Sequence, residues 1–473
     1  MRSILLPIRR ILDRAAVRVV RRHRARIDRF KLARRGFVRA LLVADARLIA
    51  AVHEHARTTG ESEEATWRRV DAYIREIVPF FNILAYYAIG HRVAGMLLRL
   101  FYEVTVEHEG ALPGQRPGLP RDAITIYLMN HRSNADYVLV SYVLAGRVAI
   151  SYAVGEWARA FPLEQLFKAF GSYFVRRRYR EPLYHAVLER YVQLVTQRGV
   201  TQGIFLEGGL TRDGRLQAPK IGLLDYVLGI ARDPAYRDRL FIVPVAVNYD
   251  RVLEDRSLLR ERAAADGAAR TTRIEQAREV LHYAGWNLLR LVVRRWKRYG
   301  RAAVVVGRPL RLAPWIVRHP ELFDLPREAR LALVRQLCDR VMDRIGALVP
   351  VTPVPLACAA LQTFAGDFVS RDRLLARIEE LCGVLETVTR RPLLDARTPD
   401  EILERALITL RMRRMVVPDG GGFAILPGNR PLVGYYANSI AHLLGPYADA
   451  VMARDALPVE QRSAHSPAAV VAL

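Results

Sequence analysis

The residues most able to do chemistry are His131 and Asp136, which stand five positions apart in the segment NHRSNAD at residues 130–136. This segment follows an apolar run at residues 124–129, so the pair falls where a strand is expected to end. A carboxylate beside an imidazole fixes its tautomer and stabilises the imidazolium, which makes the histidine a general base with a built-in orienter. On this pattern alone, Asp136 could equally cap the next helix, with His131 as a surface neighbour.

Positively charged side chains follow later predicted strands. Arg176 and Arg177 come directly after one of them, where guanidinium groups can grip a phosphate bidentately. Arg212 and Lys220 could supply a second cationic edge, and Lys220 is one of only four lysines in the chain. Each motif alone also has an ordinary structural interpretation: a solvated strand end for the arginines, and a glycine turn for the EGG segment at residues 207–209.

The composition limits the partners of such a site. At 473 residues the chain is long enough for two or three units with a sizeable core. Lysine and arginine number 73 against 48 acidic residues, a formal net charge of +25. This charge favours a polyanionic neighbour: nucleic acid, an anionic membrane surface, or phosphorylated substrates. Cys338, Cys358 and Cys382 form no C-x-x-C pair, so we expect a reducing environment and no structural zinc.

Two features near the N-terminus concern membranes. If residues 9–39 are helical, their apolar side chains lie on one side of the helix and their arginines lie on the others. Such a helix could lie on an anionic membrane surface, or it could be a solvated helix that packs on its own domain. The apolar run at residues 77–90 stops at His91 and Arg92 and resumes at residues 94–98. Neither piece reaches the ~20 residues of a bilayer span. The two pieces could form a helical hairpin dipping into one leaflet, or two core helices.

Between residues 105 and 350, short β-branched runs alternate with longer helical periods, which is the pattern of an α/β fold. We expect strands at residues 105–107, 123–129, 148–153, 172–175, 203–206, 241–248 and 302–306. We expect helices at residues 135–145, 157–170, 182–198, 220–231, 270–298 and 327–348. The proline-spaced stretch at residues 349–355 indicates a boundary to a further unit.

Four sequence blocks occur in order in this region. They are NHRSNAD at residues 130–136, GSYFVRRR at 171–178, FLEGGLTRDGR at 205–215 continued by APKIGLL at 218–224, and IVPVAVNYDRV at 242–252. Together they resemble the glycerolipid acyltransferase family with the N-H-x4-D motif, and especially its bacterial and mitochondrial glycerol-3-phosphate acyltransferases. The family blocks read approximately NHRSxxD, GxFFIRR, FxEGGRSRxGxxxxPKxGLL and VPVxxxYDR.

This resemblance implies acyl transfer from a thioester to an alcohol. Such a reaction needs a base for the hydroxyl proton, donors for the developing oxyanion and positive charge for a phosphate. His131 would be the base and Asp136 its orienter, and the attack is direct, without a serine or cysteine nucleophile. In the family, the third block is associated with glycerol phosphate and the proline of the fourth with the acyl-donor side. The expected substrate-binding residues are therefore Arg176, Arg177, Glu207, Gly208, Gly209, Arg212, Lys220 and Pro244.

One residue departs from the family pattern. Leu210 stands where the glycerol-3-phosphate enzymes usually have an arginine after the paired glycines. Loss of one charge-assisted bond to phosphate costs about 1.5–3 kcal/mol unless another side chain, such as Arg215 or Arg178, replaces it. Leu210 therefore favours a larger acceptor, 1-acyl-glycerol 3-phosphate (lysophosphatidate).

The C-terminal region bears on the same choice. We expect helices at residues 365–388 and 399–412, a hairpin at 415–426 and a final helix at 434–444. This region, with YYANSIAHL at residues 435–443, is similar to the C-terminal region of the bacterial glycerol-3-phosphate acyltransferases. The shorter lysophosphatidate acyltransferases generally lack it. The region could also be a generic helical addition, and we expect His442 to be a packed core histidine.

We therefore expect an α/β fold: a glycerolipid acyltransferase-type α/β core with N-terminal helices and a helical plus hairpin C-terminal unit. The units are membrane-associating basic amphipathic helices at residues 1–104, the acyltransferase domain at 105–349, the C-terminal domain at 350–462 and a tail at 463–473. The expected activity is transfer of a fatty acyl group from acyl-CoA or acyl-carrier protein to the sn-1 hydroxyl of glycerol 3-phosphate, in phospholipid biosynthesis. The alternatives are a lysophosphatidate acyltransferase and a non-enzymatic basic protein that binds membranes or nucleic acid.

The expected partners are an anionic membrane surface, the acyl donor, and glycerol 3-phosphate or lysophosphatidate. Nucleic acid is not expected, because aromatic residues are not interleaved with the basic runs. No metal or bound cofactor is expected, because the sequence has neither a clustered ligand set nor a dinucleotide-binding loop. We expect a peripheral or monotopic protein at the cytoplasmic face of the cell membrane.

Overall fold

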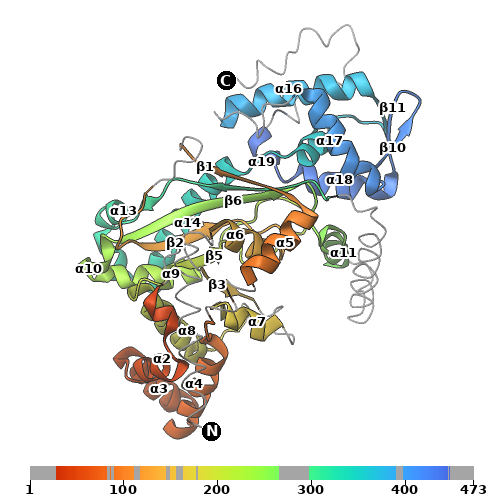
Figure 1. Cartoon of the computed structure of the whole chain (residues 1–473). Coiled ribbons are helices and arrows are strands. Elements are labelled where there is room, and N and C mark those ends of the chain that lie inside the picture. The colour runs from red at the N-terminus through yellow and green to blue at the C-terminus, as the bar shows by residue number, and fades with distance from the viewer. Residues whose placement is uncertain are drawn as a thin grey trace.

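The computed structural model describes residues 28–82, 86, 90–110, 118–144, 150–155, 163–176, 179–265, 298–389, 398–445 and 447. Within these ranges the N-terminal helices lie at one end of the molecule, the sheet lies in the middle and the C-terminal helices lie at the other end (Figure 1). No single described helix is long and apolar enough to cross a membrane, although the bent pair Arg327–Leu348 and Pro353–Gln362 meets these two criteria jointly.

The described part of the chain contains a central eight-stranded sheet of order β1-β7-β6-β2-β5-β3-β4, with β8 also paired to β6. Its strands are β1 (Glu103–His108), β2 (Ile124–Met129), β3 (Ser151–Val154), β4 (Tyr173–Phe174), β5 (Gln202–Phe205), β6 (Leu240–Tyr249), β7 (Arg301–Val306) and β8 (Leu310–Arg311). Strands β2 to β6 run parallel to one another, and β7 is antiparallel to β6. The predicted α/β class is confirmed, and each predicted strand is present.

Strand β2 shows why the sheet forms here. Its sequence ITIYLM is apolar apart from one threonine, and every one of its residues is buried. Strands covered on both faces read as continuous β-branched and aliphatic runs rather than as alternating patterns. The short strand β8 was not predicted, because its two residues carry too little periodicity to be recognised.

Helices cover this sheet in layers. They are α5 (His91–Phe101), α6 (Asp136–Leu144), α7 (Leu163–Ala169), α8 (Pro182–Gln197), α9 (Gly222–Leu228), α10 (Pro234–Arg237), α11 (Asp255–Ala265), α13 (Ala313–Val317) and α14 (Arg327–Leu348). Helix α6 packs against β7, α5 against β1 and α14 against β6. The helix predicted at residues 270–298 falls almost entirely outside the described residues.

Three N-terminal helices, α2 (Arg35–Val43), α3 (Ala46–Thr59) and α4 (Glu63–Ile77), pack against α8. The predicted amphipathic segment at residues 9–39 lies outside the described residues up to residue 27. Of the apolar run at 77–90, residues 78–82 are not helical and most of the rest is not described, whereas residues 94–98 belong to α5. The choice between a leaflet-dipping hairpin and two core helices therefore stays a prediction.

The C-terminal region contains α15 (Pro353–Gln362), α16 (Arg371–Thr389), α17 (Pro399–Met412), α18 (Arg430–Ala437) and α19 (Ala441–Leu444), with a small sheet of β9 (Phe368–Ser370), β10 (Val416–Asp419) and β11 (Gly422–Ile425). The prolines at 349–355 mark a turn of 95° between α14 and α15, a buried helix that was not predicted. The predicted hairpin and the helix at 399–412 are confirmed.

Two C-terminal predictions are wrong in detail. The helix expected at 365–388 begins only at Arg371, because the residues before it form β9, which pairs with the distant strand β11. The helix expected at 434–444 begins earlier, at Arg430, and is broken after Ala437, so its last turn forms the separate helix α19. The proposed division into units is a prediction that these elements do not test.

Candidate active site

The predicted catalytic pair lies where the sheet brings several strand ends together. Strands β5 and β6 flank β2 in parallel, so the carboxyl ends of all three meet at one edge of the sheet. His131 follows β2, Glu207 follows β5, and Tyr249 ends β6. In open α/β sheets this edge is the usual place for a ligand site.

His131 and Asp136 form a buried pair. The Nδ1 atom of His131 lies 2.9 Å from Oδ2 of Asp136, and the side chains are 1% and 0% exposed. A carboxylate at this position requires the proton on Nδ1, which makes Nε2 the basic nitrogen of the ring. The alternative of a surface histidine beside a helix cap is wrong, because the ring is buried. Asp136 begins α6, yet its carboxylate accepts from residues that precede the helix.

The carboxylate of Asp136 is held by three further donors. Its Oδ2 atom also accepts from the backbone N–H groups of Arg132, at 2.7 Å, and Ser133, at 3.0 Å. Its Oδ1 atom accepts from the hydroxyl of Tyr249 at 2.6 Å. These bonds fix both the loop after β2 and the orientation of the carboxylate toward His131.

Aromatic rings enclose the histidine. The ring of Phe205 stacks on the imidazole with centroids 4.0 Å apart and an interplanar angle of 22°. Tyr137 meets the imidazole edge-on at 5.5 Å. A charge that develops on His131 therefore lies in a water-poor surrounding, where its interaction with Asp136 is stronger than in solvent.

Glu207 positions two loops. Its Oε1 atom accepts from the backbone N–H of His131 at 2.9 Å, and its Oε2 atom accepts from the backbone N–H of Gln217 at 3.1 Å. Burial raises the pKa of Glu207 to about 7, against the opposing effects of the His131 N–H and the Arg132 guanidinium. Its role as a substrate contact stays a prediction, whereas its contacts make it a positioning residue for His131.

The glycines after Glu207 shape a tight loop. Gly208 has a φ of 68°, and a Cβ there would lie 2.6 Å from Cγ of Lys220. The backbone N–H of Lys220 donates to the carbonyl of Leu206 at 2.7 Å, which closes the loop at its far end. The loop thus brings Gly208, Gly209 and Lys220 to the sheet edge that holds His131. Leu210, the departure from the family pattern, is half-buried against the core.

The other predicted cation of this loop, Arg212, is exposed. It lies 3.2 Å from Glu261 of α11. An ion pair of this kind contributes little to stability, so its guanidinium can exchange Glu261 for a substrate phosphate at small cost.

Arg176 is placed elsewhere. It follows β4, three strands from β2 in the sheet order, which is about 14 Å away at the usual strand spacing. Its guanidinium forms a bidentate pair with Glu76 of α4, at 2.7 and 2.5 Å, and lies 4.7 Å from the ring centroid of Tyr179. The structure therefore does not bring Arg176 to His131. Arg177 lies outside the described residues.

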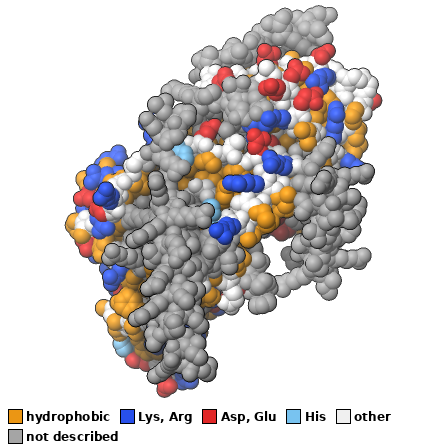
Figure 2. Space-filling view, viewed as in Figure 1, with side chains coloured by type: hydrophobic (Ala, Val, Ile, Leu, Met, Phe, Trp, Pro, Cys, Tyr) orange, Lys and Arg blue, Asp and Glu red, His pale blue; other side chains and the backbone are white. Residues whose placement is uncertain are grey.

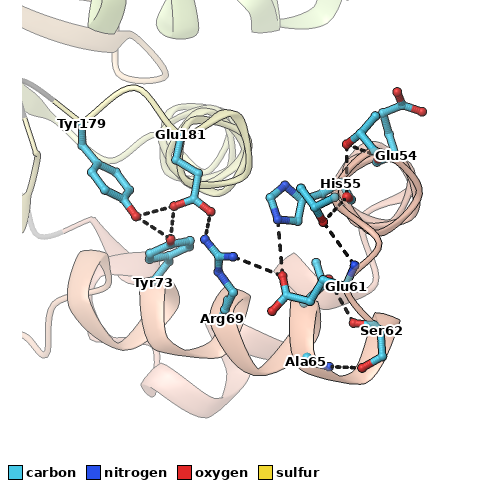
Figure 3. Close-up of polar contacts among 12 residues, drawn as sticks. Glu54, His55, Glu61, Ser62, Ala65, Arg69, Tyr73, Tyr179 and Glu181 are labelled. Atoms are coloured by element: carbon cyan, nitrogen blue, oxygen red, sulfur yellow. Dashed lines mark hydrogen bonds and ion pairs between the residues drawn. The ribbon is translucent and has the colours of Figure 1, made fainter.

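A polar cluster holds the loop that follows this arginine. Arg69 and Tyr73 of α4 point toward Glu181, at the start of α8, and Tyr179 reaches the same carboxylate from the loop (Figure 3). Together with Arg176 and Glu76, this cluster joins the N-terminal helices to the edge of the sheet. Arg176 thus has structural contacts here, and its role in substrate binding stays a prediction.

Pro244 lies in the middle of β6, opposite Leu128 of β2, and is buried. On the other side of β6, Ile242 pairs with β8 and Val245 pairs with β7. Pro244 therefore lies at the junction between the two partner strands, where a residue without a backbone N–H is tolerated. This place is inside the sheet rather than at its carboxyl edge, and the expected role on the acyl-donor side stays a prediction.

The C-terminal region touches the catalytic loops directly. The guanidinium of Arg132 donates to the carbonyl of Gly214 and lies 5.8 Å from the ring centroid of Tyr435 on α18. The side chain of Asn438 donates to the carbonyl of Asp213 at 2.8 Å. A Cβ at Gly214, whose φ is 86°, would lie 1.9 Å from the carbonyl oxygen of Tyr435. Helix α18 therefore packs against the loop that follows Glu207.

Comparison with known proteins agrees with this arrangement. Residues 115–248 match the family model described as acyltransferase, and residues 285–465 match the model of the glycerol-3-phosphate acyltransferase C-terminal region. The chain therefore contains an acyltransferase domain followed by the C-terminal region of glycerol-3-phosphate acyltransferases. The predicted resemblance is thereby confirmed.

Curated relatives carry the name glycerol-3-phosphate acyltransferase. The protein of Actinobacillus succinogenes is 29% identical over 416 residues, which cover 85% of this chain and 49% of the relative. That of Xanthomonas campestris pv. campestris is 28% identical over 461 residues, covering 93% and 49%. The chain thus spans about half the length of the curated relatives it matches.

Several residues of the site were not predicted as such. The side-chain amide of Asn130 donates to the carbonyl of Val247 at 2.9 Å and accepts from its N–H at 2.8 Å, so it clamps the end of β2 to β6. Tyr249 and Phe205 were missed as well. All three stand inside the recognised sequence blocks and are letters of the family motifs, and this was the signal that could have identified them.

Within the described ranges, no three histidine, cysteine, aspartate or glutamate side chains gather in the manner of a metal site. The expectation that the reaction needs no metal or cofactor stays a prediction.

Proposed function

We propose that this chain transfers a fatty acyl group from an acyl thioester, acyl-CoA or acyl-carrier protein, to the sn-1 hydroxyl of glycerol 3-phosphate. The observation that carries the proposal is the buried His131–Asp136 pair, with Nδ1 and Oδ2 2.9 Å apart. It lies in a chain that matches the acyltransferase model and the model of the glycerol-3-phosphate acyltransferase C-terminal region.

The proposed mechanism uses the basic nitrogen of His131. Nε2 removes the proton of the acceptor hydroxyl while the oxygen attacks the thioester carbonyl. Asp136 stabilises the imidazolium that forms. When the tetrahedral intermediate collapses, the new ester bond remains, the carbon–sulfur bond breaks, and the imidazolium returns the proton to the thiolate. Arg212 and Lys220 are proposed to hold the acceptor phosphate, because both lie on the loop closed at Leu206 next to His131.

Lysophosphatidate is the second candidate acceptor. Leu210 favours it, because a half-buried leucine gives no charge to a phosphate. The C-terminal region favours glycerol 3-phosphate, because it matches the corresponding region of the glycerol-3-phosphate enzymes and packs on the loop after Glu207. A purely binding protein is the weakest candidate, since four donors fix the Asp136 carboxylate beside a histidine.

We further propose that the chain works at an anionic membrane, at the cytoplasmic face, as a peripheral or monotopic protein. Helix α5 exposes Val93, Met96 and Leu97, and it packs on α6, the helix that begins with Asp136. Figure 2 shows hydrophobic side chains over α5 with lysine or arginine side chains beside them. Apolar side chains with flanking cations suit the headgroup region of an anionic bilayer. The net charge of +25 supports the same surface.

Acyl transfer by the purified chain tests the proposal. Labelled acyl-CoA or acyl-carrier protein is offered with glycerol 3-phosphate and, separately, with its 1-acyl derivative, in detergent and on anionic vesicles. Product from glycerol 3-phosphate supports the first-step activity. Product from the 1-acyl acceptor alone would assign the chain to the second step and make Leu210 the residue that reports it.

A further inference from the structure

A basic groove lies between α11 and α18, separate from the His131 site. Its volume is about 700 Å³, and its lining includes Arg256, Arg260 and Arg262 from α11 and Arg430 at the start of α18. The lining residues carry a formal net charge of +3, with Asp213 as their one acidic member. Arg262 pairs with Asp213 at 3.5 Å and Arg430 pairs with Asp367 at 2.5 Å, so Arg256 and Arg260 are the lining arginines on which the argument rests. Such a concentration of guanidinium groups in a concave site favours a ligand with several phosphate charges.

The arginines of this groove are crowded. Arg256 and Arg260 are one helical turn apart on α11, and therefore on the same face. Burial and the nearby Arg413 lower the pKa of Arg256, and Asp255 opposes this shift. An anion in the groove relieves this repulsion between like charges.

The walls of the groove are fixed to each other. Asp255, the first residue of α11, accepts from the hydroxyl of Tyr436 on α18 at 2.7 Å and forms an ion pair with Arg413. Asp255 and Tyr436 are buried, and the side chain of Arg413 is only 11% exposed. The groove is thus formed before a ligand binds, which lowers the entropic cost of binding.

The inner end of the groove approaches the catalytic loop. Tyr435 and Asn438 line it, and these residues contact Arg132 and Asp213, respectively. Arg132 is the neighbour of His131 in the chain. Tyr435 and Asn438 thus connect the groove to the loops beside His131.

We infer that this groove binds the nucleotide end of coenzyme A, with the arginines on the 3′-phosphate and the diphosphate and the pantetheine arm directed along α18 to the active site. This inference rests on the proposed function. The volume suits a nucleotide, since drug-sized ligands occupy about 300–1,000 Å³, and it far exceeds what glycerol 3-phosphate needs. An acidic carrier protein would instead require a face that buries about 800 Å² per partner, which a concave cavity does not offer.

The test is binding of unacylated CoA and of dephospho-CoA by titration calorimetry, with the full chain and no acceptor. The variant is Arg256→Gln/Arg260→Gln. The matched control is Arg39→Gln, which removes one arginine paired with Asp71 at 2.6 Å on α2, outside the groove. Thermal melting reports whether the variants fold.

Wild type and the Arg39→Gln control are expected to bind CoA equally, and the groove variant about tenfold or more weakly, since each charge-assisted bond contributes roughly 1.5 kcal/mol. Wild type should prefer CoA to dephospho-CoA, and the groove variant should lose much of this preference. Equal CoA affinity in the groove variant and wild type would overturn the inference.

Parallel turnover assays separate this inference from the proposed function. If wild type transfers the acyl group and the groove variant has an unchanged KM for acyl-CoA, the proposed function is supported and the assignment of the groove to CoA is rejected. Transfer from acyl-carrier protein without any CoA binding rejects the groove as well. Arginine-dependent CoA binding by a chain that transfers no acyl group supports the groove and rejects the proposed function.

Discussion

Replacing Asp136 with asparagine removes one negative charge and leaves the shape of the site intact. Oδ2 of Asp136 takes three N–H donors, from His131, Arg132 and Ser133, whereas Oδ1 takes only the hydroxyl of Tyr249. The asparagine amide can therefore keep its oxygen toward the three N–H groups and direct its NH₂ to Tyr249, because a hydroxyl can accept as well as donate. We expect folding and the tautomer of His131 to survive.

The catalytic cost follows from the lost charge. An imidazolium and a carboxylate about 4 Å apart interact by about 4 kcal/mol at an effective dielectric constant of ~20. Since 1.36 kcal/mol is a factor of ten in rate, kcat should fall by about 10²- to 10³-fold. Most of this loss should appear in kcat, because the charge on His131 develops only during the reaction.

Asp136→Ala is the matched comparison. It leaves the N–H groups of Arg132 and Ser133 and the hydroxyl of Tyr249 without their buried acceptor. At roughly 1–3 kcal/mol for each buried group left without a bond, this variant should be destabilised by several kcal/mol. Urea unfolding and steady-state kinetics measure the two effects. An Asp136→Asn variant with kcat within fivefold of wild type would refute the assigned role of the carboxylate.

Three other outcomes are expected. Burial raises the pKa of Glu207 to about 7, so the folded chain binds more protons than the unfolded chain between pH ~4.5 and 7, and Glu207 lowers stability as pH rises. Urea unfolding gives the free energy of unfolding of wild type and of Glu207→Gln at each pH. The wild-type value minus the variant value should fall by about 3 kcal/mol as the pH rises across this window. A difference that does not change with pH would contradict the buried environment assigned to Glu207. Gly214→Ala should lower the free energy of unfolding by at least about 2 kcal/mol more than Gly60→Ala does. Both glycines have a positive φ, but only a Cβ at position 214 would meet a backbone carbonyl, that of Tyr435. Equal losses in the two variants would mean that α18 shifts away from the new Cβ at little energetic cost. Arg212→Ala should raise the KM for glycerol 3-phosphate about tenfold with little change in melting temperature, since its one ion pair is exposed; an unchanged KM would assign the phosphate to another side chain.

Local sequence signals were sufficient for strands β1 to β7 of the central sheet, but not for the two-residue strand β8. Strand β2 and its parallel neighbours are continuous apolar runs, and the helix at Arg327–Leu348 was predicted with the same bounds. The His131–Asp136 pair could be recognised because only four residues separate its members and the strand end fixes their position. Features of this kind need no knowledge of distant contacts.

Features that depend on distant contacts could not be predicted in this way. Strand β9 exists because it pairs with β11, more than fifty residues later. Tyr249 reaches Asp136 across 113 positions, and Tyr435 reaches the loop at Gly214 only because the C-terminal region folds back onto the sheet. The ion pair of Arg176 with Glu76 of α4 also joins distant positions and could not be predicted from its place after a strand, and its role in phosphate binding stays a prediction.

The most direct test of the account is the rate of acyl transfer to glycerol 3-phosphate by the His131→Ala variant, with wild type measured in parallel. We expect wild type to form product and the variant to lose at least about 10³-fold in kcat, with unchanged melting temperature and unchanged binding to anionic vesicles. A folded His131→Ala variant that retains transfer within tenfold of wild type would contradict the assignment of His131 as the general base.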